Sequence, residues 1–293
     1  MLGIGLARGR AGLVVAGLLA AAALAVVAVA YASGTTAAKL PGVPKLASLE
    51  HTAVALQESR RSQAGPQASA IVGALPSSVS CGQTIKASTT LTADLYCSGK
   101  QGLILGASGI VLNLNGHFIY GSYRTEDGTR GVRALSAKDT IVNGYVYGFN
   151  EGVVVFGEAD AITNVQVTAT ANAGIFLAGT GDTAISDTAA ENGGNGIRVD
   201  YGRGDTIQSD HALNNGAYGI ALLEGGEKLL NNVVNGNKGA GITTYEDLDT
   251  LTGNTANYND GLGIDVASPQ IDGGSNTAHG NTTAEQCRGV VCS

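Results

Sequence analysis

The 293-residue sequence predicts an all-β protein, a right-handed parallel β-helix of roughly eight rungs with a repeat of about 22 residues. Three observations support this fold class: a periodic glycine, two columns of polar residues in the same register, and repeats rich in Gly, Asn, Thr, Val and Ile. A repeat this short cannot hold two helices, and its strands can bury their faces only by stacking on the next repeat.

The first column is a glycine followed directly by Val or Ile. The steps between successive glycines are 21, 22, 22, 23, 22 and 22 residues. The column comprises Gly131, Gly152, Gly174, Gly196, Gly219, Gly241 and Gly263. Such a constant step indicates one supersecondary unit repeated along an axis.

Asparagine and aspartate form the other two columns. Asparagine tolerates the left-handed turn conformation, and stacked Asn side chains can hydrogen-bond from rung to rung. We therefore expect a structural role for both columns, and we expect Asp139, Asp182, Asp205 and Asp249 to be turn formers. One column is Asn164, Asp187, Asp210, Asn232, Asn254 and Asn276, and the other is Asn192, Asn215, Asn237, Asn259 and Asn281.

Short strands should follow each periodic glycine, with side chains alternating between the core and the outside. The right hand of the helix follows from the preference of parallel strand crossovers. The expected inward residues are Ile197, Val199, Ile220, Leu222, Ile242, Ile264 and Val266, and the expected outward residues are Arg198, Ala221, Thr243 and Asp265.

The N-terminal part divides into an export segment and a linker. Arg8 and Arg10 precede 22 uncharged residues, 11–32, which end in a small-residue site typical of signal peptides. The same stretch is long enough to be an uncleaved membrane anchor. Residues 33–75 read as a linker with a short amphipathic helix at residues 46–56, a candidate lid for the first rung, and residues 76–293 form the β-helix domain.

The charge balance restricts the partners. Removal of residues 1–32 takes away two arginines and no acid, which leaves 15 basic and 24 acidic residues and a net charge of −9. Nucleic acid is therefore excluded as a partner, and membrane contact is expected only through the N-terminal segment if it is not cleaved.

The four cysteines lie near the two ends of the predicted solenoid, and export permits disulfides. Three connectivities are possible. We favour Cys81–Cys97 and Cys287–Cys292 because each pair closes a short loop. Each loop would cover an end of the solenoid, where strand edges are otherwise unpaired.

Three stretches resemble secreted bacterial right-handed β-helix proteins of the pectate-lyase-like superfamily. They are "CGQTIKASTTLTADLYCSGKQGLILGASGIVLNLNGHFIYG" at 81–121, "VNGYVYGFNEGV" at 142–153 and "QCRGVVC" at 286–292. The resemblance covers about residues 81–293 and implies the fold and a secreted or cell-surface location. It implies no single activity, because the group includes polysaccharide lyases, hydrolases, epimerases and a periplasmic copper-maturation factor.

The chain departs from the catalytic patterns of that group. It has no Asp-Asp pair and no Asp-Pro-His-Glu run, and its nearest match to the Gly-His-Gly of pectin hydrolases is Ala278-His279-Gly280. Asp210-His211 matches part of a pectate-lyase motif, but no arginine cluster accompanies it. One Met and four scattered His argue against copper handling.

Candidate ligand-binding residues lie in the turns after the Gly-Ile strands. Carboxylates stacked on successive rungs can share a calcium ion or raise one another's pKa, arginines can neutralise an acidic sugar, and tyrosines can stack on a sugar ring. The alternative is that these turns have no ligand and that their acidic residues are simply exposed to solvent. The candidates are Arg198, Asp200, Tyr201, Glu224, Tyr245, Glu246 and Asp247, with calcium considered at Asp200, Glu224 and Glu246.

A nine-residue insertion at 122–130 is the second-rank candidate, because insertions in solenoids often line the binding face. Its candidate residues are Tyr123, Arg124, Glu126 and Asp127.

The sequence thus predicts an exported β-helix protein that binds an extracellular polysaccharide on its lateral face and, if it is an enzyme, acts as a lyase or hydrolase through the acids at 200, 224 and 246. A non-catalytic cell-surface scaffold or adhesion module is the alternative. The substrate and the oligomeric state stay undetermined.

Overall fold

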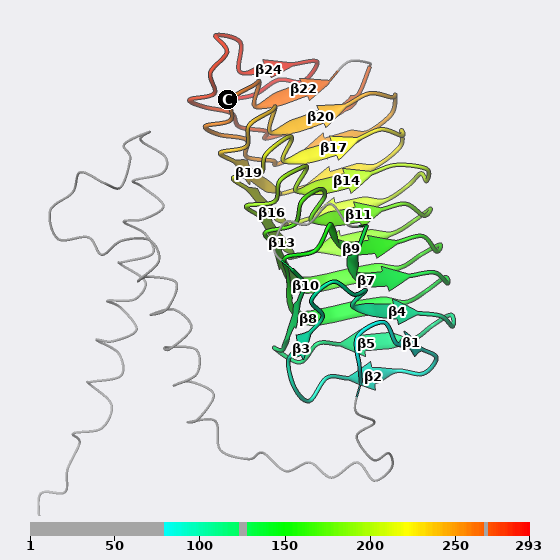
Figure 1. Cartoon of the computed structure of the whole chain (residues 1–293). Coiled ribbons are helices and arrows are strands. Elements are labelled where there is room, and N and C mark those ends of the chain that lie inside the picture. The colour runs from blue at the N-terminus through cyan, green and yellow to red at the C-terminus, as the bar shows by residue number, and fades with distance from the viewer. Residues whose placement is uncertain (1–78, 123–127, 267–268) are drawn as a thin grey trace, which may run out of the picture. The chain divides into compact units, whose positions relative to one another are not determined.

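The computed structural model describes residues 79–122, 128–266 and 269–293, and its strands stack into one parallel β-solenoid (Figure 1). The predicted export segment, the linker helix at 46–56 and candidates Tyr123, Arg124, Glu126 and Asp127 lie outside the described residues. The described part contains 24 strands and no helix, and hence no helix long and apolar enough to cross a membrane.

One sheet, here called sheet A, has ten strands that all pair in parallel, one from each turn of the chain. Ten stacked strands correspond to about nine complete turns of the solenoid, slightly more than the roughly eight turns expected. The strands are β1 (Thr84–Ile85), β4 (Leu103–Leu105), β7 (Arg130–Ala134), β9 (Glu151–Val155), β11 (Ile175–Leu177), β14 (Ile197–Val199), β17 (Ile220–Leu222), β20 (Ile242–Thr244), β22 (Ile264–Val266) and β24 (Cys287–Arg288).

The other sheet, sheet B, has 14 strands, and most turns of the chain contribute two short strands to it, separated by a bend. In β8 and β10 the two strands run together as one. The strands are β2 (Thr89–Thr90), β3 (Leu95–Tyr96), β5 (Val111–Asn113), β6 (Phe118–Tyr120), β8 (Thr140–Tyr147), β10 (Ala161–Thr168), β12 (Thr183–Ile185), β13 (Thr188–Ala190), β15 (Thr206–Gln208), β16 (His211–Leu213), β18 (Lys228–Leu230), β19 (Val233–Asn235), β21 (Thr250–Thr252) and β23 (Ile271–Gly274).

The core is a set of aliphatic columns between the sheets. Every inward residue predicted in β14, β17, β20 and β22 is buried, with exposed fractions of 0 to 3 %. The periodic glycine is required by the close approach of each turn to its neighbours. A Cβ on Gly219 would lie 2.1 Å from Val234 Cγ1 and 2.7 Å from the carbonyl oxygen of Gly241 on the next rung.

Both predicted disulfides are confirmed. Cys81 bonds to Cys97 across 16 residues, and Cys287 bonds to Cys292 across five. They lie at opposite ends of the described solenoid, next to its first and last strands in sheet A.

The asparagine ladder from Asn192 to Asn281 is also confirmed. Asn215 shows the pattern: its Nδ2 donates to Asn237 Oδ1 (3.0 Å) and to the Ala189 carbonyl (3.0 Å), and its backbone N–H also donates to Asn237 Oδ1 (2.9 Å). Each amide is thereby satisfied within a buried column, which is the condition for burying a polar group at low cost.

The second polar column contains one error in the predicted register. Asp187 Oδ1 accepts a hydrogen bond from the N–H of Val165 (2.7 Å), so Val165 and not Asn164 occupies the equivalent position in the preceding rung. Asn164 instead adopts a left-handed bend with φ 55° and is exposed. The rest of the column, from Asp187 to Asn276, stacks as expected.

A third buried column consists of acids. Asp139, Asp182, Asp205 and Asp249, which we expected to be turn formers, are 0 to 1 % exposed, and Asp160 and Glu227 continue the series. Asp160 Oδ1 accepts the N–H of Asp139 (2.7 Å), and Asp182 Oδ1 accepts the N–H of Asp160 (2.9 Å). The carboxylates therefore hold successive turns in register.

Burial changes the protonation of these carboxyls. It raises the pKa of Asp182 to about 7 and that of Glu227 to about 9, and neighbouring carboxylates add to both effects. In the second column, burial raises the pKa of Asp187 to about 7 and that of Asp210 to about 8. These groups hold a proton in the folded protein at pH values where the unfolded chain has lost it.

We predict that replacing Asn237 by Ala lowers the free energy of unfolding by about 2–4 kcal/mol, because buried partners on both neighbouring rungs lose their hydrogen bonds. Urea titration measures the change. Lys238→Ala, the control, removes an exposed pair with Asp260 and should cost less than about 0.5 kcal/mol. Equal stability of Asn237→Ala and wild type would contradict the structural role.

We also predict that the protein loses stability as pH rises. For Asp187 and Asp210 the folded pKa lies above the ordinary value of 3.8, so their stabilising contribution is complete below about pH 4 and disappears as pH passes about 7 to 8. Urea midpoints at pH 5.5 and 8.5 test this.

The matched variant is Asp210→Asn, because asparagine already occupies the same column at Asn232 and Asn254. It should raise the midpoint at pH 8.5 and flatten the pH dependence. A variant with the same pH slope as wild type would show that Asp210 does not titrate as expected.

Candidate functional site

The outer face of sheet A carries one column of side chains that point away from the core. Arg133 of β7 pairs with Val154 of β9, Val154 with Phe176 of β11, and Phe176 with Arg198 of β14. The column continues through Ala221, Thr243 and Asp265 to Arg288. At about 4.8 Å per rung, Arg133 and Arg198 lie about 14 Å apart.

Arginines and aromatic rings alternate in the first part of this face, here called the arginine–aromatic face and defined by Arg133, Phe156, Phe176, Arg198 and Tyr201. The Arg133 guanidinium lies 5.2 Å from the Phe156 ring centre, and that of Arg198 lies 5.1 Å from the Phe176 ring centre. The rings of Phe156 and Phe176 meet edge to face at 6.3 Å. The two distances between arginine and ring fit cation–π contacts, which hold the planar guanidinium groups against the rings.

The charges on this face do not balance. Arg130 Nε bonds to Glu151 Oε2 (2.7 Å), and Arg198 bonds to Asp200 (2.5 Å). Arg133 has no ion pair within the described residues, and its Nε is buried without a hydrogen-bond partner there. Three guanidinium groups thus face two carboxylates, which leaves one positive charge at Arg133.

Two tyrosines lie farther along the same face. The hydroxyl groups of Tyr218, before β17, and Tyr245, after β20, are 3.4 Å apart. The Tyr245 contact raises the pKa of Tyr218, as does the carboxylate of Asp265, which points outward from β22. The phenols therefore meet on the outer side of the sheet, where the outward residues Ala221 and Thr243 are buried.

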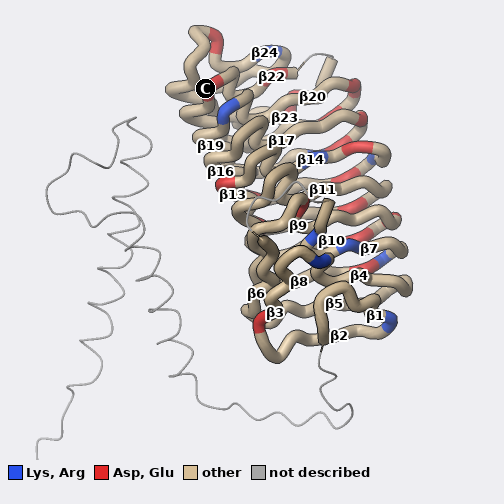
Figure 2. The backbone as a smooth tube through the Cα atoms, in the orientation of Figure 1, with Lys and Arg blue, Asp and Glu red and all other residues tan. Residues whose placement is uncertain are grey.

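The structure brings together only part of the predicted site. Arg198 and Tyr201 belong to the arginine–aromatic face, where Asp200 is bonded to Arg198 and the exposed Tyr201 ring lies 6.3 Å from that of Phe176. Glu224 lies on the turn, 4.0 Å from Arg203. Tyr245, Glu246 and Asp247 are exposed in the turn after β20. Figure 2 shows acidic residues recurring along these turns.

The calcium prediction finds no support in this arrangement. Within residues 79–122, 128–266 and 269–293, no three His, Cys, Asp or Glu side chains are grouped so that they could hold a metal ion. Asp200 is bonded to Arg198 instead, and Asp200, Glu224 and Glu246 are not gathered into one group.

The histidine and cysteine side chains of the described residues do not fit a copper site. His117 is buried and bonded to Asp94 (3.0 Å), whereas His211 and His279 are exposed on other rungs. All four cysteines are in disulfides, and Met1 and His51 lie outside the described residues. Copper prefers clustered imidazole, thiolate or thioether ligands, and the described part of the chain presents none.

Sequence reasoning missed Arg133, Phe156, Phe176 and Tyr218 as site residues. A signal for two of them was present: Arg133 and Phe176 stand two residues after a periodic glycine, as Arg198 does. Comparing this position across all repeats would have placed them in one outward column.

The comparison with solved structures found six chains that are similar to this one at low sequence identity. Geobacillus virus E2 ORF18 is 14 % identical with a TM-score of 0.50 over 72 % of this chain and 54 % of that one, so the chain spans about half of its length. Pectate lyase Pel9A is 15 % identical (TM-score 0.38; 68 % of this chain, 72 % of that one). The Azotobacter vinelandii mannuronan C-5 epimerase AlgE4 A-module is 14 % identical (TM-score 0.39; 73 % and 88 %).

At 14 % identity, the likeness to ORF18 shows the fold alone. None of the curated proteins matches the chain. A family model described as "Periplasmic copper-binding protein (NosD)" matches residues 102–289, which is more than half of the sequence. The chain therefore belongs to the NosD family of parallel β-helix proteins.

Proposed function

We propose that the protein binds an acidic extracellular polysaccharide along the arginine–aromatic face of sheet A. The observation that carries the proposal is Arg133: its guanidinium is held on Phe156, and no described carboxylate neutralises it. A carboxylate of an acidic sugar can supply the missing charge through paired hydrogen bonds.

The shape of the face supports a long ligand. Its outward column follows the solenoid axis from β7 to β14, and the partly exposed Arg133 and Arg198 stand at the two ends of this row, so a long chain molecule can contact both. The exposed rings of Phe156 and Tyr201 add apolar surface of the kind on which sugar rings pack.

The proposal is for binding and does not extend to bond cleavage. The Asp200 carboxylate, an expected acid or base, is already engaged by Arg198. Copper is not part of the proposal, because the described donors do not fit it. An exported location suits an extracellular glycan and agrees with the two disulfides and with the periplasmic description of the family.

We predict that Arg133→Gln raises the dissociation constant for polygalacturonate about tenfold or more, because it removes a charge-assisted hydrogen bond worth about 1.5–3 kcal/mol. Calorimetry on the whole chain measures the change. Binding should also weaken as salt concentration rises.

Arg203→Gln is the matched control, because Arg203 is an exposed arginine on the turn, 4.0 Å from Glu224 and outside the arginine–aromatic face. It should bind as wild type does. Equal affinity of Arg133→Gln and wild type would remove the proposed site. Failure of polygalacturonate and alginate to bind at all would favour the non-catalytic scaffold.

A further inference from the structure

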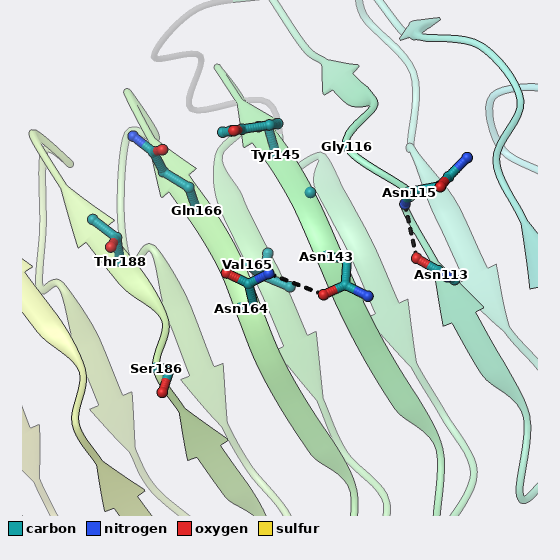
Figure 3. A pocket seen from close by; sticks show the side chains of 11 residues that line it. Asn113, Asn115, Gly116, Asn143, Tyr145, Asn164, Val165, Gln166, Ser186 and Thr188 are labelled. Atoms are coloured by element: carbon teal, nitrogen blue, oxygen red, sulfur yellow. Dashed lines mark hydrogen bonds between the residues drawn. The ribbon is translucent and has the colours of Figure 1, made fainter. Parts of the chain in front are cut away.

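Sheet B contains a trough at the bend between its two rows of strands. The trough has a volume of about 440 Å³ and crosses successive turns of the chain (Figure 3). Asn115, Asn143, Asn164 and Ser186 occupy the bend in four consecutive turns, each with a positive φ between 52° and 60°. Three steps of about 4.8 Å make this row about 14 Å long.

The second wall of the trough is the outward column of the following strands. Tyr145 of β8 pairs with Gln166 of β10, and Gln166 pairs with Thr188 of β13. Figure 3 shows these three side chains in a row opposite the asparagines. The trough is thus formed by the bends on one side and by these strands on the other.

The chemistry of the lining is uniform. All the polar side chains that line it are amides or hydroxyls, and no Asp, Glu, Lys, Arg or His is among them. Asn143 Oδ1 accepts a hydrogen bond from Asn164 Nδ2 (2.9 Å), which fixes the orientation of both amides. The side chains of Gln166, Ser186 and Thr188 have no hydrogen-bond partner among the described residues. Their donors and acceptors are therefore available to a ligand.

An aromatic stack continues the trough on the N-terminal side. The Tyr145 ring stacks on Phe118 at 4.3 Å, Phe118 on Tyr120 at 4.9 Å, and Tyr120 on Tyr96 at 4.9 Å. Tyr96 is 75 % exposed, which is unusual for a large ring unless it meets a partner. Amides that orient hydroxyl groups therefore lie beside rings on which a sugar can pack.

We propose that this trough is a second binding site, which takes a neutral oligosaccharide lying along the rungs. Sugar hydroxyl groups donate and accept hydrogen bonds, as the lining amides and hydroxyls do. An acidic sugar would enter without a cation to balance its charge, whereas the arginine–aromatic face supplies one. The site lies on sheet B, so it does not depend on the function proposed for sheet A.

Affinity electrophoresis of the whole chain tests the proposal, in gels that contain xyloglucan, galactomannan, mixed-linkage β-glucan or starch. At least one of these neutral polysaccharides should retard the protein. Gln166→Ala, at an exposed position, should raise the apparent dissociation constant about fivefold, as expected for one lost hydrogen bond. Tyr145→Ala should do the same or more, with its unfolding midpoint measured to confirm folding.

His211→Ala is the matched control, because His211 follows Thr188 in the same outward column but lies outside the trough. The neutral polysaccharide should retard this variant as strongly as wild type. It should also retard Arg133→Gln as strongly as wild type, and this result would separate the trough from the site proposed on sheet A. The proposal is overturned if none of the four polysaccharides retards the wild-type protein. It is also overturned if folded Gln166→Ala and Tyr145→Ala are retarded as strongly as His211→Ala.

Discussion

The register between successive turns is the constraint on which the rest of this structure depends. A strand of three residues makes too few backbone hydrogen bonds to fix its register against the neighbouring strand. Buried polar side chains fix that register instead. At most positions of the polar columns, a side-chain oxygen accepts the backbone N–H of the equivalent residue one turn earlier, as Asn237 does for Asn215. Because such a bond is made only at one register, the columns align all the sheet strands together.

This alignment turns single residues into continuous surfaces. One outward position in sheet A becomes a row that joins Arg133 to Arg198, and one bend in sheet B becomes a row of amides. The two rows differ in charge although the same repeat builds both. A solenoid of this kind can therefore present two chemically distinct faces to a polymer, each at the spacing of the rungs.

The choice of acid or amide in the buried columns has an electrostatic consequence. Asparagine can donate as well as accept, so Asn192 to Asn281 form a neutral ladder with its amides satisfied. A carboxylate can only accept unless it is protonated, and Asp210 and Asp249 each have one oxygen without a partner. The turns between Asp139 and Asp249 are therefore held in part by groups whose hydrogen bonding depends on a proton.

The sequence by itself determined the parallel β-helix, both disulfides and the closeness of Arg198, Asp200 and Tyr201, because a constant period and short loops leave few alternatives. The tertiary structure decided the rest. Asn164 was assigned to the wrong column because the repeat length varies between 21 and 23 residues. Counting along the chain can therefore misplace a residue by one position. Burial of Asp182 and Asp205, and the contact of Arg133 with Phe156, depend on how each turn closes over its neighbour. That closure is set by packing between turns, which no single repeat of the sequence contains.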